Sequence, residues 1–310
     1  EGSMVRTIGA YAFRFGGSYS QQKEEKVITL LASLNTVGDG AFAGYGKLSV
    51  TFAAGDNTLS CGNNVFSDCE IGTLSLPKNM TALPNFFFGL SVENIVVDPA
   101  NPVFLSDNGV LYTKNGEGKA DVLVLYPASK SDASFEIPNT VTAIASGAFM
   151  GAQFSSVTIP SSVTSIGEQA FYYTPNLTSV TIPASVTDIG EKAFAAYSRY
   201  TKLTTVTFED GDAVLTIGAH AFDNQKKLTA IVLPARAKTI GDYAFYNTQG
   251  VTTLTLGGVE TIGAHAFDSC YYAGEVTFPA TLKSIGEKAF YCSSKWGGGS
   301  YSKITAYRFA

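Results

Sequence analysis

The sequence predicts a β-rich repeat solenoid, in which short coils of chain stack on one another with their strands parallel. The first observation is a phrase of the form IGxxAF that recurs along the 310 residues. The second is a phrase of the form LxxVxIP that precedes it, as at 177–183. The third is the spacing, since most of the closing phenylalanines stand 22 to 24 residues apart. A period of this length indicates stacked units, none of which can bury its apolar side alone.

The IGxxAF phrase defines the phase of the whole chain. It stands at 8–13, 166–171, 189–194, 217–222, 240–245, 262–267 and 285–290, with variants at 37–42 and 144–149. Two less complete matches to the phrase end at Phe66 and Phe88, which therefore take the closing position. The expected organisation is one domain over residues 1–310, built from about twelve units with strands about 4.8 Å apart.

The unit from Leu177 to Phe194 shows how each element is predicted. Alternation at Val180 and Ile182 indicates a short strand. Pro183 ends that strand, because proline has no N–H to donate to the ladder. Gly190 is expected to mark a turn that the missing Cβ makes easy. The residues expected to point inward are Leu177, Val180, Ile182, Val186, Ile189, Ala193 and Phe194.

These residues resemble the BspA-like leucine-rich repeat family, whose signature is LxxVxIPxxVxxIGxxAF, from Val5 to Phe309. The resemblance implies a right-handed coil with a parallel sheet on its concave face and short turns or 3₁₀ segments on its return side. It also implies a bacterial or protist protein that is secreted or held at the cell surface. The family includes adhesins that bind host extracellular proteins, so an extracellular or host protein, or a glycan, is the partner expected by analogy.

The repeat breaks between Phe88 and Phe149, where an insertion is expected over 98–134. Its two apolar runs, 109–113 and 121–126, are joined by a turn and predict a β-hairpin. The hairpin is either an elaboration typical of the family or a dedicated binding loop. At the far end, Ile304, Tyr307 and Phe309 indicate a final strand with no return phrase. We expect either a fragment of a longer polypeptide or terminal coils shielded by irregular segments, and favour the fragment.

Composition excludes several classes of protein. With 21 basic and 26 acidic residues the net charge is -5, which disfavours a nucleic-acid partner. The longest apolar stretch, around 122–126, is too short to cross a bilayer. We expect a monomer with no transmembrane segment in this chain, located outside the cell or at its surface.

Groups that support catalysis or metal binding are scarce. His220 and His265 occupy equivalent positions two units apart, about 10 Å from each other, so they cannot share one metal ion. Glu209, Asp210 and Asp212 form either a solvated loop or a weak cation site. No nucleophile or phosphate-loop motif stands out, and a glycosidase would need a positioned pair of carboxylates that no motif marks. We therefore predict no enzyme activity, no cofactor and no metal.

Four cysteines leave the disulfide state open. Cys61 with Cys69, or Cys270 with Cys292, are conceivable pairs, while buried thiols are the alternative.

Two surfaces are candidates for binding a partner. Outward strand positions are rich in hydroxyls, including Thr181, Thr207 and Thr255, which either support the strands or form a low-charge recognition face. Tyrosines follow the AF phrase and are expected along one rim, where they either pack between coils or bind a partner. These tyrosines are Tyr172, Tyr173, Tyr197, Tyr200, Tyr246, Tyr271 and Tyr272. Arg199, Lys202 and Arg308 are expected as their polar neighbours. The predicted function is a non-enzymatic, adhesin-like binding module, and the alternative is a passive spacer that projects other domains of a larger envelope protein.

Overall fold

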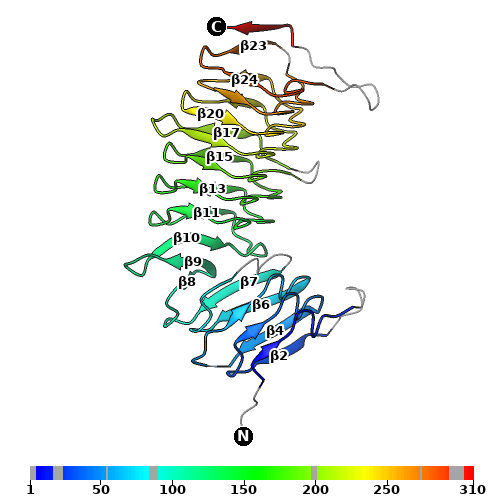
Figure 1. Cartoon of the computed structure of the whole chain (residues 1–310), viewed down its shortest axis with the longest axis vertical. Helices are drawn as coiled ribbons and strands as arrows, with labels where there is room; N and C mark the ends of the chain where they lie inside the picture. Colours follow the sequence, from blue (N-terminus) through cyan, green and yellow to red (C-terminus); the bar gives the residue numbers. More distant parts are fainter. Residues whose placement is uncertain are drawn as a thin grey trace. The chain divides into compact units, whose positions relative to one another are not determined.

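The computed structural model describes residues 5–16, 24–53, 55–83, 90–196, 201–272, 274–292 and 304–310. These residues form a parallel-sheet β-solenoid of about 11 coils, and none of them is helical, which confirms the predicted fold class. The chain divides into two compact units, Glu1–Lys130 and Ser131–Ala310. Both are drawn in Figure 1.

Unit 1, Glu1–Lys130, contains two parallel ladders. The first consists of β2 (Lys26–Leu30), β4 (Gly46–Phe52), β6 (Cys69–Leu76) and β7 (Ser91–Val97). The second consists of β1 (Thr7–Ile8), β3 (Thr36–Val37) and β5 (Ser60–Cys61). Two coils of this unit therefore supply one long and one short strand each, β2 with β3 and β4 with β5, where the sequence indicated one strand per unit.

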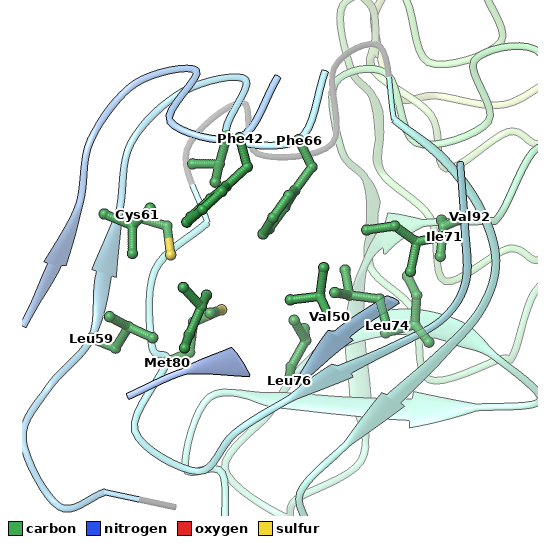
Figure 2. Close-up of a cluster of buried hydrophobic side chains, with 14 of the residues drawn as sticks. Phe42, Val50, Leu59, Cys61, Phe66, Ile71, Leu74, Leu76, Met80 and Val92 are labelled. Atoms are coloured by element: carbon green, nitrogen blue, oxygen red, sulfur yellow. The ribbon is translucent and has the colours of Figure 1, made fainter. Parts of the chain in front are cut away.

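The interior of unit 1 is filled by apolar side chains from both ladders (Figure 2). Val50, Leu74 and Val92 come from the long strands, and Cys61 comes from a short one. The ring of Phe66 stacks on that of Phe42, with centroids 5.7 Å apart. Stacking successive coils is what removes this surface from water.

The predicted hairpin of the insertion is confirmed and has a third strand. The antiparallel strands β9 (Val110–Lys114) and β10 (Ala120–Leu125) pair Tyr112 with Leu123. β8 (Phe104–Asp107) pairs with β9 through a two-residue turn at Asn108 and Gly109, both of which have positive φ. Asn-Gly is the favoured pair for such a turn, because both positions require a left-handed backbone.

Unit 2, Ser131–Ala310, repeats the same plan, and β11, β13, β15 and β17 lie one after another along it in Figure 1. The longer strands are β11 (Ser134–Glu136), β13 (Ser156–Thr158), β15 (Ser179–Ile182), β17 (Thr205–Phe208), β19 (Ala230–Val232), β21 (Thr253–Thr255), β23 (Glu275–Phe278) and β25 (Ala306–Phe309). The strands of the second ladder, which contain the isoleucine of the IG phrase, are β12 (Ala143–Ile144), β14 (Ser165–Ile166), β16 (Asp188–Ile189), β18 (Leu215–Ile217), β20 (Ala237–Ile240), β22 (Thr261–Ile262) and β24 (Ser284–Ile285). The final strand expected near Tyr307 is β25, which pairs with β23.

The unit from Leu177 to Phe194 matches its prediction closely. All seven residues expected to point inward are at most 3% exposed. β15 ends at Ile182, directly before Pro183, as the missing N–H requires. In the ladder that contains β14, β16 and β18, the isoleucine of the IG phrase lies in register from coil to coil. Ile166 pairs with Ile189, and Ile189 pairs with Ile217.

Gly190 directly precedes the turn at 191–194, but a close contact between coils explains the glycine. Its φ is not in the left-handed region, so it does not provide a turn that only glycine allows. A Cβ on Gly190 would instead lie 2.6 Å from the backbone nitrogen of Glu168 in the preceding coil. The glycine is needed because two backbones approach closely at this point.

The closing phenylalanines form a continuous stack inside unit 2. Phe171 and Phe194 have ring centroids 4.7 Å apart, and Phe194 and Phe222 have centroids 5.1 Å apart with parallel planes. The stack runs from Phe149 to Phe290 with spacings between 4.7 and 5.4 Å. Offset stacks at these distances add to the energy of burying the rings.

Candidate functional site

The threonines proposed as a recognition face are exposed on strands β15, β17 and β21 of unit 2. Thr181 and Thr207 are direct partners in the parallel register of β15 and β17. Thr255 is exposed in β21 and lies opposite the exposed Val232 of β19. Each of these three threonines flanks a residue that faces the interior, so the pleat directs its side chain outward. The structure therefore places Thr181 beside Thr207 and puts Thr255 on another strand pair.

A second row of hydroxyls bonds one coil to the next. Thr178, Thr204, Thr229 and Thr252 each donate from Oγ1 to a backbone carbonyl of the preceding coil, at 3.1 to 3.2 Å. The backbone N–H of each residue donates to the same carbonyl oxygen. These hydroxyls are occupied by bonds within the stack, which supports the structural explanation for part of the threonine bias.

The predicted tyrosines are distributed between exposed and half-buried positions. Tyr173 is 41% exposed and has a φ of 54°, while Tyr172 and Tyr246 are half-buried. Tyr271 and Tyr272 are also half-buried, and the Tyr272 hydroxyl donates to the carbonyl of Glu275 at 3.1 Å. Burial, followed by the carboxylates of Asp268 and Asp223, raises the pKa of Tyr246. Tyr197 and Tyr200 lie outside the described residues.

Two of the three charged neighbours suggested for these tyrosines have partners within unit 2. Lys202 donates to the side-chain oxygen of Asn176 at 2.9 Å. Arg308 forms two bonds to the carboxylate of Glu275, at 2.6 and 2.9 Å. The third, Arg199, lies outside the described residues.

Sequence reasoning missed a ring stack that involves both histidines. Tyr243 lies between His220 and His265, with ring centroids 4.8 and 4.6 Å away and nearly parallel planes. The three residues share the fourth position of the IGxxAF phrase in successive coils, and this alignment could have revealed the stack. The two spacings agree with the expected separation of about 10 Å between equivalent positions two coils apart.

Each histidine is oriented by an aspartate three residues later. Nδ1 of His220 lies 2.9 Å from Oδ2 of Asp223, and Nδ1 of His265 lies 2.7 Å from Oδ2 of Asp268. Burial raises the pKa of the Asp223 carboxyl, and the hydrogen bond with His220 opposes that shift. Tyr246 contacts Tyr243 edge to face, with centroids 5.6 Å apart, so this predicted tyrosine adjoins the ring stack.

The acidic loop of Glu209, Asp210 and Asp212 lies next to a buried arginine. Arg236 is only 4% exposed and donates from its guanidinium to the backbone carbonyls of Pro183, Val186, Glu209 and Ala213. Desolvation lowers the pKa of Arg236, and Glu209 and Asp210 oppose that effect. The guanidinium, which comes from the following coil, thus fixes the loop to the coil before it, a role for which no motif gave a signal.

Within the described ranges, no three His, Cys, Asp or Glu side chains are grouped so as to hold a metal ion. Those ranges also contain no disulfide, so neither conceivable cysteine pair is formed. Burial raises the pKa of Cys61 to about 12 and that of Cys69 to about 11. Cys270 is buried as well, and Cys292 is half-exposed. No helix in the described part of the chain is long and apolar enough to cross a membrane.

The sequence matches the family described as the BspA type leucine rich repeat region, in six copies over residues 6–101, 128–248 and 195–296. The chain belongs to the BspA-type leucine-rich repeat family. This confirms the resemblance carried by the LxxVxIP and IGxxAF phrases. No curated protein matches the chain.

Solved structures of other bacterial leucine-rich repeat proteins share the fold. A leucine-rich repeat protein from Eubacterium ventriosum is 24% identical with a TM-score of 0.70, covering 88% of this chain and 79% of that one. A leucine rich cell surface protein from Faecalibacterium prausnitzii is 20% identical with a TM-score of 0.54, covering 100% and 71%. The pneumococcal vaccine antigen PcpA is 20% identical with a TM-score of 0.54, covering 99% of this chain and 60% of the antigen. At these identities the likeness shows the fold alone.

Proposed function

We propose that this BspA-type leucine-rich repeat protein is a non-enzymatic, adhesin-like binding module, secreted or held at a cell surface. Its partner is an extracellular or host protein, or a glycan. The observation that carries the proposal is the exposed, uncharged hydroxyl face at Thr181 and Thr207 on a rigid stack of coils. Repeat proteins use such extended sheet surfaces for recognition.

Two further observations support this proposal. Tyr173 is exposed, and Tyr246 and Tyr271 present part of their rings on the turn edge of the same unit. Tyrosine offers a large apolar surface and a polar tip at a low entropic cost, which suits binding surfaces. One structural neighbour is described as a cell surface protein and another as a vaccine antigen, which favours an extracellular location for this chain.

A passive spacer is the second candidate function. The bonds that Thr178, Thr204, Thr229 and Thr252 make between coils favour it, because those hydroxyls are already used within the stack. A spacer requires only the stack itself, so charges placed on the sheet face would not change its behaviour.

The experiment is a binding screen of the whole chain against extracellular matrix proteins and a glycan array. In the test variant, Thr181→Lys and Thr207→Lys place two charges on the sheet face. The matched control is Thr29→Lys, which adds charge to an exposed threonine of β2 in unit 1. We expect the double variant to lose at least about tenfold in affinity, roughly 1.4 kcal/mol, and the control to bind as the original does.

A Tyr173→Asn variant tests the turn edge separately, since asparagine tolerates the positive φ at that position. Loss of binding in this variant would extend the interface to the tyrosines. A screen with no ligand, or with ligands that all variants bind equally, contradicts the binding proposal and favours the spacer.

A further inference from the structure

A polar hollow of about 480 Å³ lies on the turn edge of unit 1. Three successive coils line it. The first contributes Tyr11 and Arg14, the middle one Gly40 and Ala43, and the third Asn64 and Ser67. Its volume falls within the roughly 300–1,000 Å³ typical of small-ligand sites.

The middle coil carries small residues at two positions of the lining, Gly40 and Ala43. The residue two positions before the closing phenylalanine is Gly40 in this coil, as it is Gly147 in the first such coil of unit 2. The later coils of unit 2 carry larger residues there, such as His220, Tyr243 and His265. The residue one position after that phenylalanine is Tyr246 in one coil of unit 2 but Ala43 here. The ring of Tyr11 lies against Gly40, because a Cβ on that glycine would be only 2.6 Å from Cε1 of Tyr11.

The hollow is lined by polar groups that have no partner among the described residues. The side chains of Asn63, Asn64 and Ser67 make no hydrogen bond among the described residues, and Arg14 forms no ion pair there. The Arg14 guanidinium lies over the Tyr11 ring, 5.6 Å from its centroid.

One wall of the hollow is held in place by a bond between coils. Oδ1 of Asp39 accepts from the backbone N–H of Asn63 at 2.8 Å, which fixes the aspartate against the next coil. Asp39 and Asn63 both belong to the lining, so their remaining oxygen and amide groups border the hollow.

We propose that this hollow binds an acidic saccharide, with a carboxylate on Arg14 and sugar hydroxyls on the asparagine and serine side chains. A guanidinium recognises a carboxylate through two parallel N–H donors. Each sugar hydroxyl both donates and accepts, and the asparagine amides and the Ser67 hydroxyl do the same. Tyr11 places an aromatic ring beside these groups, and such a ring suits the apolar face of a sugar.

The lining favours a saccharide over a peptide side chain or a bare anion. Ala43 and the Tyr11 ring supply the only apolar surface, which is too little to anchor a hydrophobic side chain. Asp39 in the lining opposes a multiply charged anion. This site lies in unit 1 and stands apart from the surfaces proposed above in unit 2.

The test measures binding of the whole chain to a hyaluronan tetrasaccharide, which alternates glucuronate with N-acetylglucosamine. Chitotetraose, made of N-acetylglucosamine alone, is the neutral comparison. We expect saturable binding of the acidic probe at or below about 1 mM and at least tenfold weaker binding of the neutral one. Arg14→Gln is expected to remove that preference.

Two variants address the hollow itself. Ala43→Tyr restores the ring that Tyr246 supplies in unit 2 and is expected to abolish binding. Because Ala43 is only 4% exposed, folding of this variant is checked by circular dichroism. Asn64→Gly removes a lining amide while keeping the φ of 54° free of strain, and it is expected to weaken binding at least tenfold. Arg308→Gln, in unit 2, is the control and should bind as the original does.

Several outcomes would overturn the proposal. One is that the hyaluronan tetrasaccharide shows no saturable binding at about 5 mM, and another is that both probes bind equally. The others are full binding of the acidic probe by Asn64→Gly and its displacement by an equal concentration of inorganic phosphate.

Discussion

At the scale of single residues, the turns of each coil impose a left-handed backbone on side chains that seldom adopt it. Gln169, Lys192 and Lys288 have φ between 53° and 55°, and Gly147 has a φ of 67° at the equivalent position. A residue with a Cβ pays about 1–2 kcal/mol for this conformation, which glycine avoids. The stacking of the coils therefore imposes the left-handed conformation at the fourth position of the IGxxAF phrase. Glutamine and lysine do not favour that conformation by themselves.

Two substitutions at this position of the phrase are expected to change the free energy of unfolding in opposite directions. Gly147→Ala adds a Cβ whose nearest neighbour is Met150 Cε at 3.8 Å, so only backbone strain opposes it. We expect a loss of about 1 kcal/mol for Gly147→Ala and a gain of about 0.5 kcal/mol for Gln169→Gly. Urea unfolding of the two variants measures both effects, and a stabilised Gly147→Ala would contradict this reasoning.

The buried thiols of unit 1 predict a loss of stability in alkali. An unfolded cysteine ionises near its ordinary pKa of 9.0, whereas Cys61 in the folded chain has a pKa of about 12. Between these values the folded state holds the proton and the unfolded state releases it, so stability falls as pH rises. The expected slope is about 1.4 kcal/mol per pH unit for this thiol.

Cys61→Ala is the matched variant for that measurement. It is expected to lower stability at neutral pH through the small cavity it leaves, and to flatten the decline between about pH 9 and pH 11. Unfolding in urea at several pH values gives both slopes. Identical slopes for the two proteins would mean that the thiol does not remain protonated in the folded chain.

At the scale of the coil, the glycine of the IG phrase sets how closely neighbouring coils approach. A Cβ on Gly218 would lie 2.6 Å from the carbonyl oxygen of Ile189 and 2.9 Å from the carbonyl carbon of Gly190. Neither atom belongs to a flexible side chain, so the two coils would have to separate. The same contact recurs at Gly167, Gly241, Gly263 and Gly286.

Gly218→Ala is therefore expected to destabilise unit 2 by about 2–3 kcal/mol. Gly72→Ala is the control, because its Cβ would find only the Glu93 carboxylate, 3.9 Å away, and its φ is not left-handed. We expect the control to stay within about 0.5 kcal/mol of the original. Chemical denaturation of both variants checks this, and equal effects would exclude close approach as the cause.

The longer ladder and the hairpin were predictable because each carries a local signal. The alternation of Val180 and Ile182, stopped by Pro183, marks a strand at any point in the chain where it occurs. Most strands of the second ladder, such as β14 at Ser165–Ile166, are only two residues long and show no period of their own. Their pairing depends on the neighbouring coil, which a single unit does not reveal.

The candidate sites were less predictable, because they depend on what neighbouring coils place side by side. The stack of His220, Tyr243 and His265 appears only when three units are aligned on the IGxxAF phrase. The hollow beside Gly40 and Ala43 is lined by residues of three coils, so no single unit reveals it. Arg236 was not foreseen because its partners are backbone carbonyls, which carry no sequence signal.

At the scale of the whole molecule, stability is a sum of coils and of the interfaces between them. The phenylalanine stack of unit 2 continues through every coil from Phe149 to Phe290, so each coil depends on the one before it. In unit 1 the rings of Phe13, Phe42 and Phe66 stack in the same way. Such nearest-neighbour coupling makes unfolding cooperative as long as the interfaces dominate.

The sequence predicts one solenoid over residues 1–310, since the repeat phase resumes at Phe135 and Ile137 after the insertion at 98–134. We therefore expect a single calorimetric transition whose van't Hoff and calorimetric enthalpies agree. Gly218→Ala, placed in unit 2, should then shift the whole transition to lower temperature. If the units Glu1–Lys130 and Ser131–Ala310 unfold independently, this variant splits the trace and moves only the part due to unit 2. Phe66→Leu, placed in unit 1, is the reciprocal variant, and separate responses to the two substitutions would contradict a single cooperative solenoid.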